Sequence, residues 1–189
     1  NNRSKCVRYI LLGGIIILFP LIYIIVIYNR LTKLYNKVKE SWSEVDIHLK
    51  ERSDLIPNVV KTVKGYKNYE KDALIGIINA RSEVLKAENK DETIRANEKL
   101  DNAISKLLVT IESYPELKSN ENFMSLQDNL VDIENKISVS RSKYNKSVLN
   151  YKNKLEVFPS NIIASIFNFK QELFFEIEKE DKENPKTKF

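Results

Sequence analysis

Few side chains in this 189-residue chain have the types and spacing that chemistry requires. There is one histidine, His48, and one cysteine, Cys6. One histidine argues against a Ser-His-Asp triad or a multi-histidine metal site, and one cysteine excludes internal disulfides and thiolate-rich zinc sites. Only 4 glycines are present, which argues against a phosphate-binding loop. We therefore expect no catalytic residues, no metal and no cofactor, in a protein that is not an enzyme.

The most informative polar residues surround Pro57. Arg52 interrupts an otherwise apolar repeat, and Asp54 and Asn58 lie on either side of the proline. One interpretation is structural: a buried Arg52 pairs with a carboxylate, and Asp54 satisfies backbone groups freed by the proline. The carboxylate candidates on another helix are Asp132 and Glu134. The other interpretation is a partner-recognition site at a helix kink, formed by Arg52, Asp54, Pro57 and Asn58, and the residues alone leave both interpretations open.

An uncharged apolar run from Ile10 to Ile27 lies near the beginning of the chain, flanked by Tyr9 and Tyr28. A helix of this length measures about 27 Å, close to the ~30 Å hydrocarbon core of a bilayer. A cleaved signal peptide has a shorter apolar region of roughly 7–15 residues and a small-residue cleavage site, which is missing after Ile27. We expect an uncleaved, single-pass transmembrane anchor at residues 10–28, preceded by a short basic tail at residues 1–9.

Apolar residues downstream recur in alternating steps of four and three, the pattern of a heptad seam. The first seam runs from Leu31 to Tyr66 and keeps its phase across Pro57, which predicts one helix with a kink near Pro57. This helix ends either at Gly65 or in the Asn68-Tyr69 region. A second helical pattern begins near Tyr69 and ends at Pro115. Inside it lies a polar patch at residues 87–93. There, Asp91 or Thr93 caps a new helix, or the helix continues.

The third seam runs from Leu126 to Leu155, after a predicted loop at residues 114–122, and is stopped by Pro159. Three long helices that each bury one apolar stripe must pack on one another. The sequence therefore predicts an all-α fold: the transmembrane helix, then an antiparallel bundle over residues 29–170 with three long helices and a short C-terminal helix near Ile162 to Phe169. We expect residues 171–189 to form an extended tail rich in acids and lysines.

Several of these segments resemble the LemA family. The stretch from Tyr28 to Glu70 carries Asp54-Leu55-Ile56-Pro57-Asn58, and the C-terminal half carries Val157-Phe158-Pro159-Ser160-Asn161 and the closing Pro185-Lys186-Thr187-Lys188-Phe189. The resemblance implies a bacterial, membrane-anchored helical bundle without known catalytic activity. A related branch serves in magnetosome membrane formation. Some relatives carry a lipid-attached cysteine before the Tyr-Asn pair, which places their domain outside the cytoplasm. This chain has Val26-Ile27 there, so its side stays open, with a lean toward the extracytoplasmic side.

The formal net charge is +5, but the lysines alternate with acidic residues and form no long basic block, so we expect no nucleic-acid partner. The leading functional hypothesis is a membrane-anchored scaffold or adaptor that presents a rigid bundle to a membrane or envelope protein. The alternative is a self-assembling protein that organises or shapes the membrane, which requires a homo-oligomer. The predicted location is the bacterial cell membrane, with the lipid bilayer bound through the N-terminal anchor.

Overall fold

The computed structural model describes residues 2–65 and 71–175, and for residues 2–17 and 71 it describes the backbone alone. Within this part of the chain there are helices and no strand, which confirms the all-α prediction. The helices are α1 (Asn2–Lys64), α2 (Lys71–Lys86), α3 (Lys90–Ile111), α4 (Pro115–Lys118), α5 (Glu121–Glu156) and α6 (Ser160–Ile166). Helix α1 ends directly before Gly65, one of the two predicted ends. The other, in the Asn68-Tyr69 region, lies outside the described residues, as do the seam position Tyr66 and tail residues 176–189.

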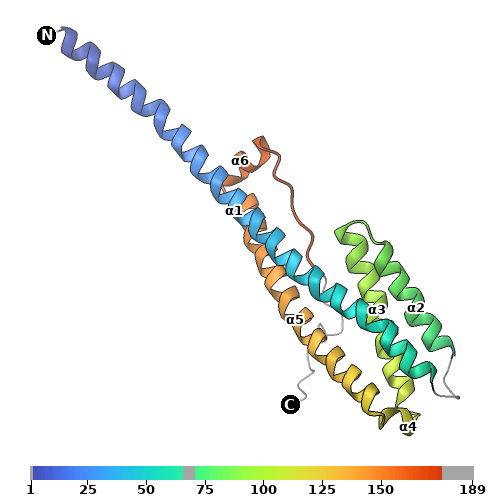
Figure 1. Ribbon diagram of the computed structural model, residues 1–189. Coiled ribbons are helices and arrows are strands. Elements are labelled where there is room, and N and C mark those ends of the chain that lie inside the picture. The colour runs from blue at the N-terminus through green and yellow to red at the C-terminus, as the bar shows by residue number, and fades with distance from the viewer. Residues whose placement is uncertain (1, 66–70, 176–189) are drawn as a thin grey trace, which may run out of the picture. The chain divides into compact units, whose positions relative to one another are not determined.

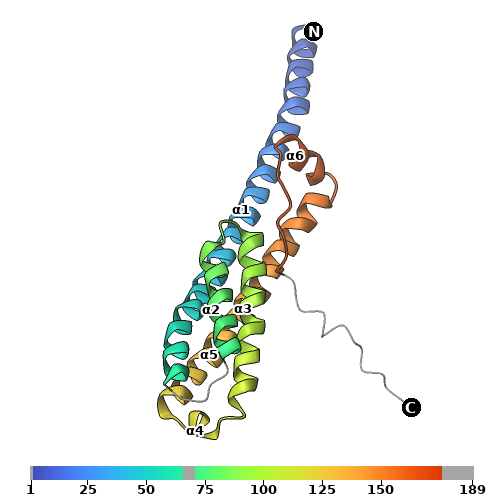
Figure 2. The ribbon, with the colours of Figure 1, turned by 90° about the vertical axis from the view of Figure 1, so that its right-hand side faces the viewer.

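The chain divides into two compact units, and α1 and α5 contribute to both of them. The first unit consists of Asn1–Ser41 and Asn145–Phe174, and the second of Trp42–Tyr144 with the chain from Phe175 onward. In the second unit, α1, α2, α3 and α5 lie alongside one another with alternating chain directions (Figures 1 and 2). The short helix α4 connects α3 to α5 at one end, so this unit is an antiparallel four-helix bundle.

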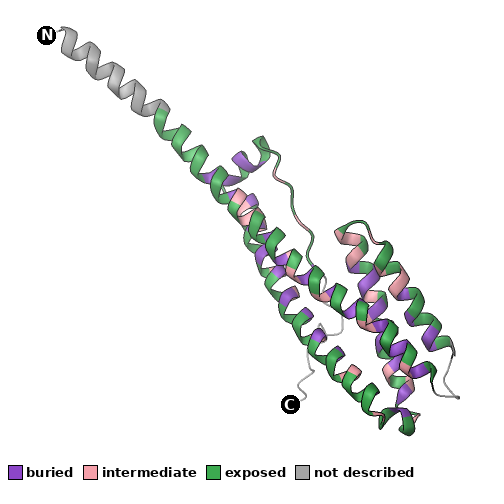
Figure 3. Cartoon of the chain, viewed as in Figure 1, coloured by how far each residue is buried: buried purple, intermediate pink, exposed green. Residues whose placement is uncertain are grey.

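The core of the second unit is apolar and draws on every helix of the bundle. Buried residues lie on the helix sides that face neighbouring helices (Figure 3). Examples are Ile56, Val59 and Val63 from α1, Ala73 and Ile77 from α2, Leu100 and Ile104 from α3, Leu117 from α4, and Phe123 and Leu130 from α5. At about 25 cal/mol per Å² of buried apolar surface, such a core is the main stabilising contribution to the unit.

The first unit contains α1 up to Ser41, residues 145–156 of α5, which run in the opposite direction, and α6. Its core contains Leu31 and Val38 from α1 and Val148 from α5. The rings of Tyr35 and Tyr151 pack with centroids 5.6 Å apart. This pairing confirms that the first and third predicted helices are antiparallel neighbours.

Most positions of the first and third heptad seams that the structure describes are buried, and the remaining ones, Tyr35, Trp42 and Leu126, are half-buried. The first seam buries Leu31, Val38, Val45, Leu49, Arg52, Ile56, Val59 and Val63, and the third buries Leu130, Ile133, Ile137, Ser140, Tyr144, Ser147, Tyr151 and Leu155. Helix α1 is unbroken across Pro57, as the constant seam phase predicted. The sequence pattern therefore identified which face of each helix is buried.

The second helical pattern forms two helices, one of the two alternatives left open, because the polar patch contains a helix start. The cap is Asn89, whose side-chain oxygen accepts a hydrogen bond of 3.0 Å from the backbone N–H of Glu92. Glu92 in turn accepts from the backbone N–H of Glu88 at 2.9 Å. This reciprocal arrangement resembles a capping box and starts α3 before the predicted caps Asp91 and Thr93. The predicted loop at residues 114–122 also contains α4, whose first residue is Pro115, a position that proline favours.

Candidate functional site

Arg52 is buried at the centre of the second unit, with its side chain fully shielded from solvent. One terminal nitrogen, Nη1, donates to Glu134 Oε1 at 2.7 Å and also to Asp101 Oδ1. The other, Nη2, donates to the side-chain oxygen of Asn97 at 2.9 Å. Because these partners lie on α3 and α5, the side chain from α1 connects three helices. The structural interpretation of Arg52 was thus correct in requiring a carboxylate.

The carboxylate of Asp101 is shared between two arginines. Its second oxygen accepts a bond of 3.2 Å from Arg141 Nη2. The Arg141 guanidinium lies over the Phe175 ring, 4.2 Å from its centroid. Two arginines therefore face two carboxylates, those of Asp101 and Glu134, so that the charges of the cluster balance. This balance reduces the cost of removing the ions from water, which otherwise exceeds the attraction between them.

The sequence identified one of the two carboxylate partners. Glu134 was a candidate and is correct, whereas Asp132 pairs with Lys136 on its own helix at 2.7 Å. Asp101 was missed because the heptad pattern says which helix face is buried and not which residues of different helices meet. The polar atoms Arg52 Nε, Ser53 Oγ and Arg141 Nε are buried without a hydrogen-bond partner among the described residues.

Pro57 removes one hydrogen bond from the middle of α1. Proline has no N–H, so the carbonyl of Ser53, four residues earlier, loses its helical donor. Arg81 on α2 replaces it, donating from Nε to the Ser53 carbonyl at 2.9 Å. Asp54 is exposed, and a carboxylate has no proton to donate to a carbonyl when ionised. The replacement donor therefore comes from a neighbouring helix and not from Asp54.

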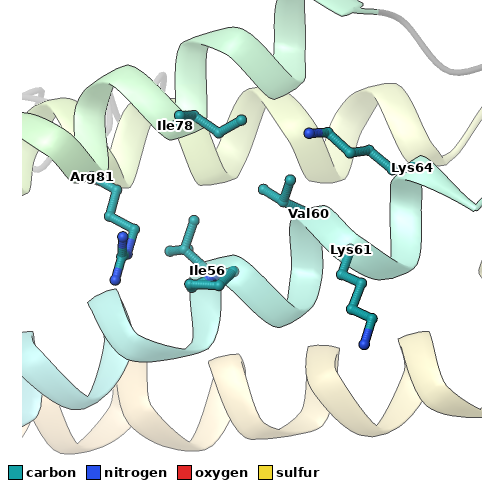
Figure 4. A pocket seen from close by; sticks show the side chains of 7 residues that line it. Ile56, Val60, Lys61, Lys64, Ile78 and Arg81 are labelled. Carbon is teal, nitrogen blue, oxygen red and sulfur yellow. The ribbon is translucent and has the colours of Figure 1, made fainter.

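A groove lies between α1 and α2, beside Pro57 and Arg81. Its volume is about 450 Å³, and it is lined by Ile56, Pro57, Val60, Lys61, Lys64, Ile78 and Arg81. Arg81 reaches from α2 toward Ile56, Lys64 extends toward Ile78, and Lys61 points away from α2 (Figure 4). The floor is thus apolar, and three cationic side chains lie around it.

Among the residues that the structure describes, no acidic side chain lines this groove, although acids and lysines alternate over much of the sequence. Within the described part of the chain, no ion pair involves Lys61, Lys64 or Arg81. Arg81 is held by its Nε bond, which leaves its two terminal nitrogens for another acceptor. An apolar floor with unpaired cations suits a ligand that carries both apolar groups and carboxylates or phosphates.

The predicted recognition site is divided by the structure. Pro57 lines the groove, whereas Arg52 belongs to the buried cluster and Asp54 and Asn58 are exposed without lining the groove. Reasoning from the sequence missed Arg81, Lys61 and Lys64. The signal that could have found Arg81 is the carbonyl that Pro57 leaves without a donor, since a buried carbonyl requires one.

The remaining candidates for chemistry among the described residues are His48 and the acidic side chains. His48 Nδ1 lies 3.0 Å from Glu51 Oε2 on the same helix. Among the described side chains, no group of three or more histidines, cysteines or acids is placed to hold a metal ion. The acids of the buried cluster are instead neutralised by arginines.

Comparison with known protein families matches residues 41–189 of the chain to the LemA family. The match includes the groove, the buried arginine cluster and the corner between α5 and α6. A search of curated proteins finds no match.

Proposed function

Because the chain belongs to the LemA family, we propose that it is a non-enzymatic scaffold, anchored in the bacterial cell membrane, which binds a membrane or envelope protein in the groove beside Pro57. Family and fold together fit a helical protein that associates with a membrane. The single observation that carries the proposal is the apolar groove surrounded by three cationic side chains, which form no ion pair with any residue that the structure describes.

The anchor is supported by the N-terminal part of α1. Among the described residues, α1 is the one helix long and apolar enough to cross a membrane. Its apolar side chains from Leu18 to Val26 are exposed to solvent, where a bilayer would cover them. We favour the extracytoplasmic side for the soluble part.

The chemistry of the groove defines the partner. Ile56 and Val60 from α1 and Ile78 from α2 would accept apolar side chains. The guanidinium of Arg81 presents a planar pair of donors that matches a carboxylate, and Lys61 and Lys64 add positive charge. The partner segment should therefore carry acidic residues next to apolar ones, and its binding should weaken as salt is raised.

The test places a photo-crosslinking amino acid at Ile78, which lines the groove, in the full-length protein in its native membrane. We expect an adduct with a different protein, attached through a segment that contains both acidic and apolar residues. The charge variant Lys61→Glu/Lys64→Glu should abolish the adduct. The matched control Lys50→Glu/Lys106→Glu changes the same charge at two exposed lysines of the same unit that do not line the groove, and it should keep the adduct.

Two results would overturn the proposal. Adducts of this chain with itself alone would favour the self-assembling, membrane-organising alternative. An adduct that survives the groove charge reversal as well as it survives the control reversal would show that the groove does not select the partner.

A further inference from the structure

The corner between α5 and α6 leaves an apolar surface exposed. Ser160, at the beginning of α6, is buried and its Oγ donates to the carbonyls of Lys154 at 2.6 Å and Val157 at 2.8 Å. This bonding closes the corner by satisfying carbonyls at the end of α5. Five apolar residues at this corner are exposed: Val157, Phe158, Ile162, Ile166 and Phe167. Phe158 is 74% exposed and Ile166 70%, which leaves them nearly without partners.

This surface also lacks charge. From Val157 to Phe169 there is no charged residue, although 30% of the whole chain is charged. Apart from the anchor region, no other stretch of the sequence is uncharged for as long. Lys170 follows immediately. An exposed apolar patch of this kind marks a binding surface, and the cation at its edge suits anionic headgroups.

The surface lies next to the expected membrane interface, which favours lipid as its binding partner. Helix α6 ends in a Schellman motif: Asn168 has a φ of 55°, and the N–H of Phe169 donates to the Ala164 carbonyl at 2.9 Å. The turn brings Phe167 and Phe169 to Tyr28, with ring centroids 4.9 and 5.6 Å away. Tyr28 is the residue directly after the apolar run of α1, where an aromatic ring occupies the membrane interface.

We propose that the exposed apolar face of the α5–α6 corner is a second membrane contact, which enters the interfacial layer of the bilayer next to Tyr28. Helix α6 has seven residues and would bind a bilayer poorly alone. Fixed to α1 by its aromatic contacts, it is already at the membrane surface, so its binding costs little additional entropy. The inference rests on the proposed anchoring of α1 and adds a contact that fixes the depth and rotation of the first unit.

The test measures membrane depth at single nitroxide labels by electron paramagnetic resonance in the full chain, with Cys6→Ser to remove the native thiol. The chain is reconstituted in vesicles of phosphatidylethanolamine and phosphatidylglycerol. The test labels are Ile166→Cys and, as a second site, Phe158→Cys. Ile22→Cys reports the anchor. Leu149→Cys is the matched control, because Leu149 is an exposed apolar residue of α5 in the same unit. It lies more than one helical turn before the end of α5 at Glu156.

We expect the Ile166 and Phe158 labels to be severalfold more accessible to oxygen, relative to a water-soluble nickel reagent, than the Leu149 label. A lipid-like Ile22 label with water-like labels at Ile166 and Phe158 would overturn the second contact and leave the anchor intact. A water-like Ile22 label would overturn the anchor itself. If the corner labels are shielded from both reagents and dipolar broadening appears between copies, the surface binds a second chain and the inference is wrong.

Discussion

Arg52 occupies a seam position at which a heptad pattern normally places an apolar side chain, and it is nevertheless fully buried. The burial of this arginine is tolerated because the two terminal nitrogens of Arg52 donate hydrogen bonds to Asn97, Asp101 and Glu134. Such a cluster contributes specificity more than stability, since the ions lose their hydration when the bundle forms. Its bonds join α1 to α3 and α5.

Removing Arg52 should be costly because two carboxylates then lose their shared cation. We expect Arg52→Ala to lower the free energy of unfolding by about 3–5 kcal/mol, measured by urea denaturation of the full chain in detergent with circular dichroism. The control is Arg95→Ala, which removes an exposed arginine of α3 with a single i,i+4 pair and should cost about 0.5 kcal/mol or less. A similar small loss for both variants would contradict the assigned role.

Tyr151 provides a prediction about alkaline pH. Burial, followed by the neighbouring Tyr35 and the Glu172 carboxylate, raises the pKa of its phenol to about 12 from the usual 10.0. Between these two values the folded chain holds a proton that the unfolded chain has released, so stability must fall as pH rises from 10 to 12. We expect wild type to lose stability more steeply in this range than Tyr151→Phe, by at most about 2–3 kcal/mol. Urea midpoints at pH 9 and 11.5 test this, and equal slopes for the two proteins would refute it.

At the scale of secondary structure elements, Pro57 shows how a helix defect is repaired by its neighbour. Helix α1 continues through the proline, and the lost backbone bond is replaced by Arg81 of α2. The same hydrogen bond holds Arg81 at the end of the groove. The two terminal nitrogens of Arg81 have no partner among the described residues. The proline therefore links the geometry of α1 to the charge of the candidate site.

A double-mutant cycle tests this repair. Arg81→Met leaves the Ser53 carbonyl without a donor and should cost about 1–3 kcal/mol. In a Pro57→Ala background the helix regains an N–H for that carbonyl, so the same substitution should cost about 1 kcal/mol less. Urea denaturation of the four proteins gives the coupling. If Arg81→Met costs the same in both backgrounds, Arg81 does not substitute for the missing donor.

Helix α3 shows why element boundaries are harder to predict than elements. Asp91 and Thr93 have suitable side chains for a cap, yet Asn89 takes the role because Glu92 is correctly spaced to complete the reciprocal bonds. Ending α2 at Lys86 and starting α3 at Lys90 turns one predicted helix into a hairpin. The bundle of the second unit consequently has four long helical segments where three were expected.

At the scale of the whole molecule, the sequence has two long uncharged stretches, residues 9–29 and 157–169. In both, the described side chains leave exposed apolar surface. Elsewhere, acids and lysines alternate along the helices and keep their outer faces soluble. Both stretches belong to the first unit, which favours that unit as the part of the chain that contacts lipid.

The anchor leads to a prediction about membrane retention. We expect the full chain to stay in the membrane pellet after washing with alkaline carbonate. Leu18→Lys/Phe19→Lys should release much of it, because each lysine at the middle of a span costs about 2.5–3.5 kcal/mol. The control Ile47→Lys alters an isoleucine of the same helix that is as exposed as Leu18 and should stay in the pellet. Release of wild type by carbonate would refute the anchor.

The sequence by itself determined the helical class, the apolar run near the N-terminus and the buried face of each long helix. These properties follow from local periodicity, because a helix of 3.6 residues per turn presents its stripe to whatever it packs against. It also indicated that a buried Arg52 must find an acid, since an unpaired ion is too costly to bury.

Tertiary structure alone decided which residues of different helices meet. Three contacts depend on the axial offset between neighbouring helices: Arg52 with Asp101, Arg81 with the Ser53 carbonyl, and Phe167 with Tyr28. Side-chain periodicity carries no information about this offset, because sliding one helix past another by a turn preserves every seam. The groove arises in the same way, from residues of α1 and α2 that are distant in sequence and share no pattern.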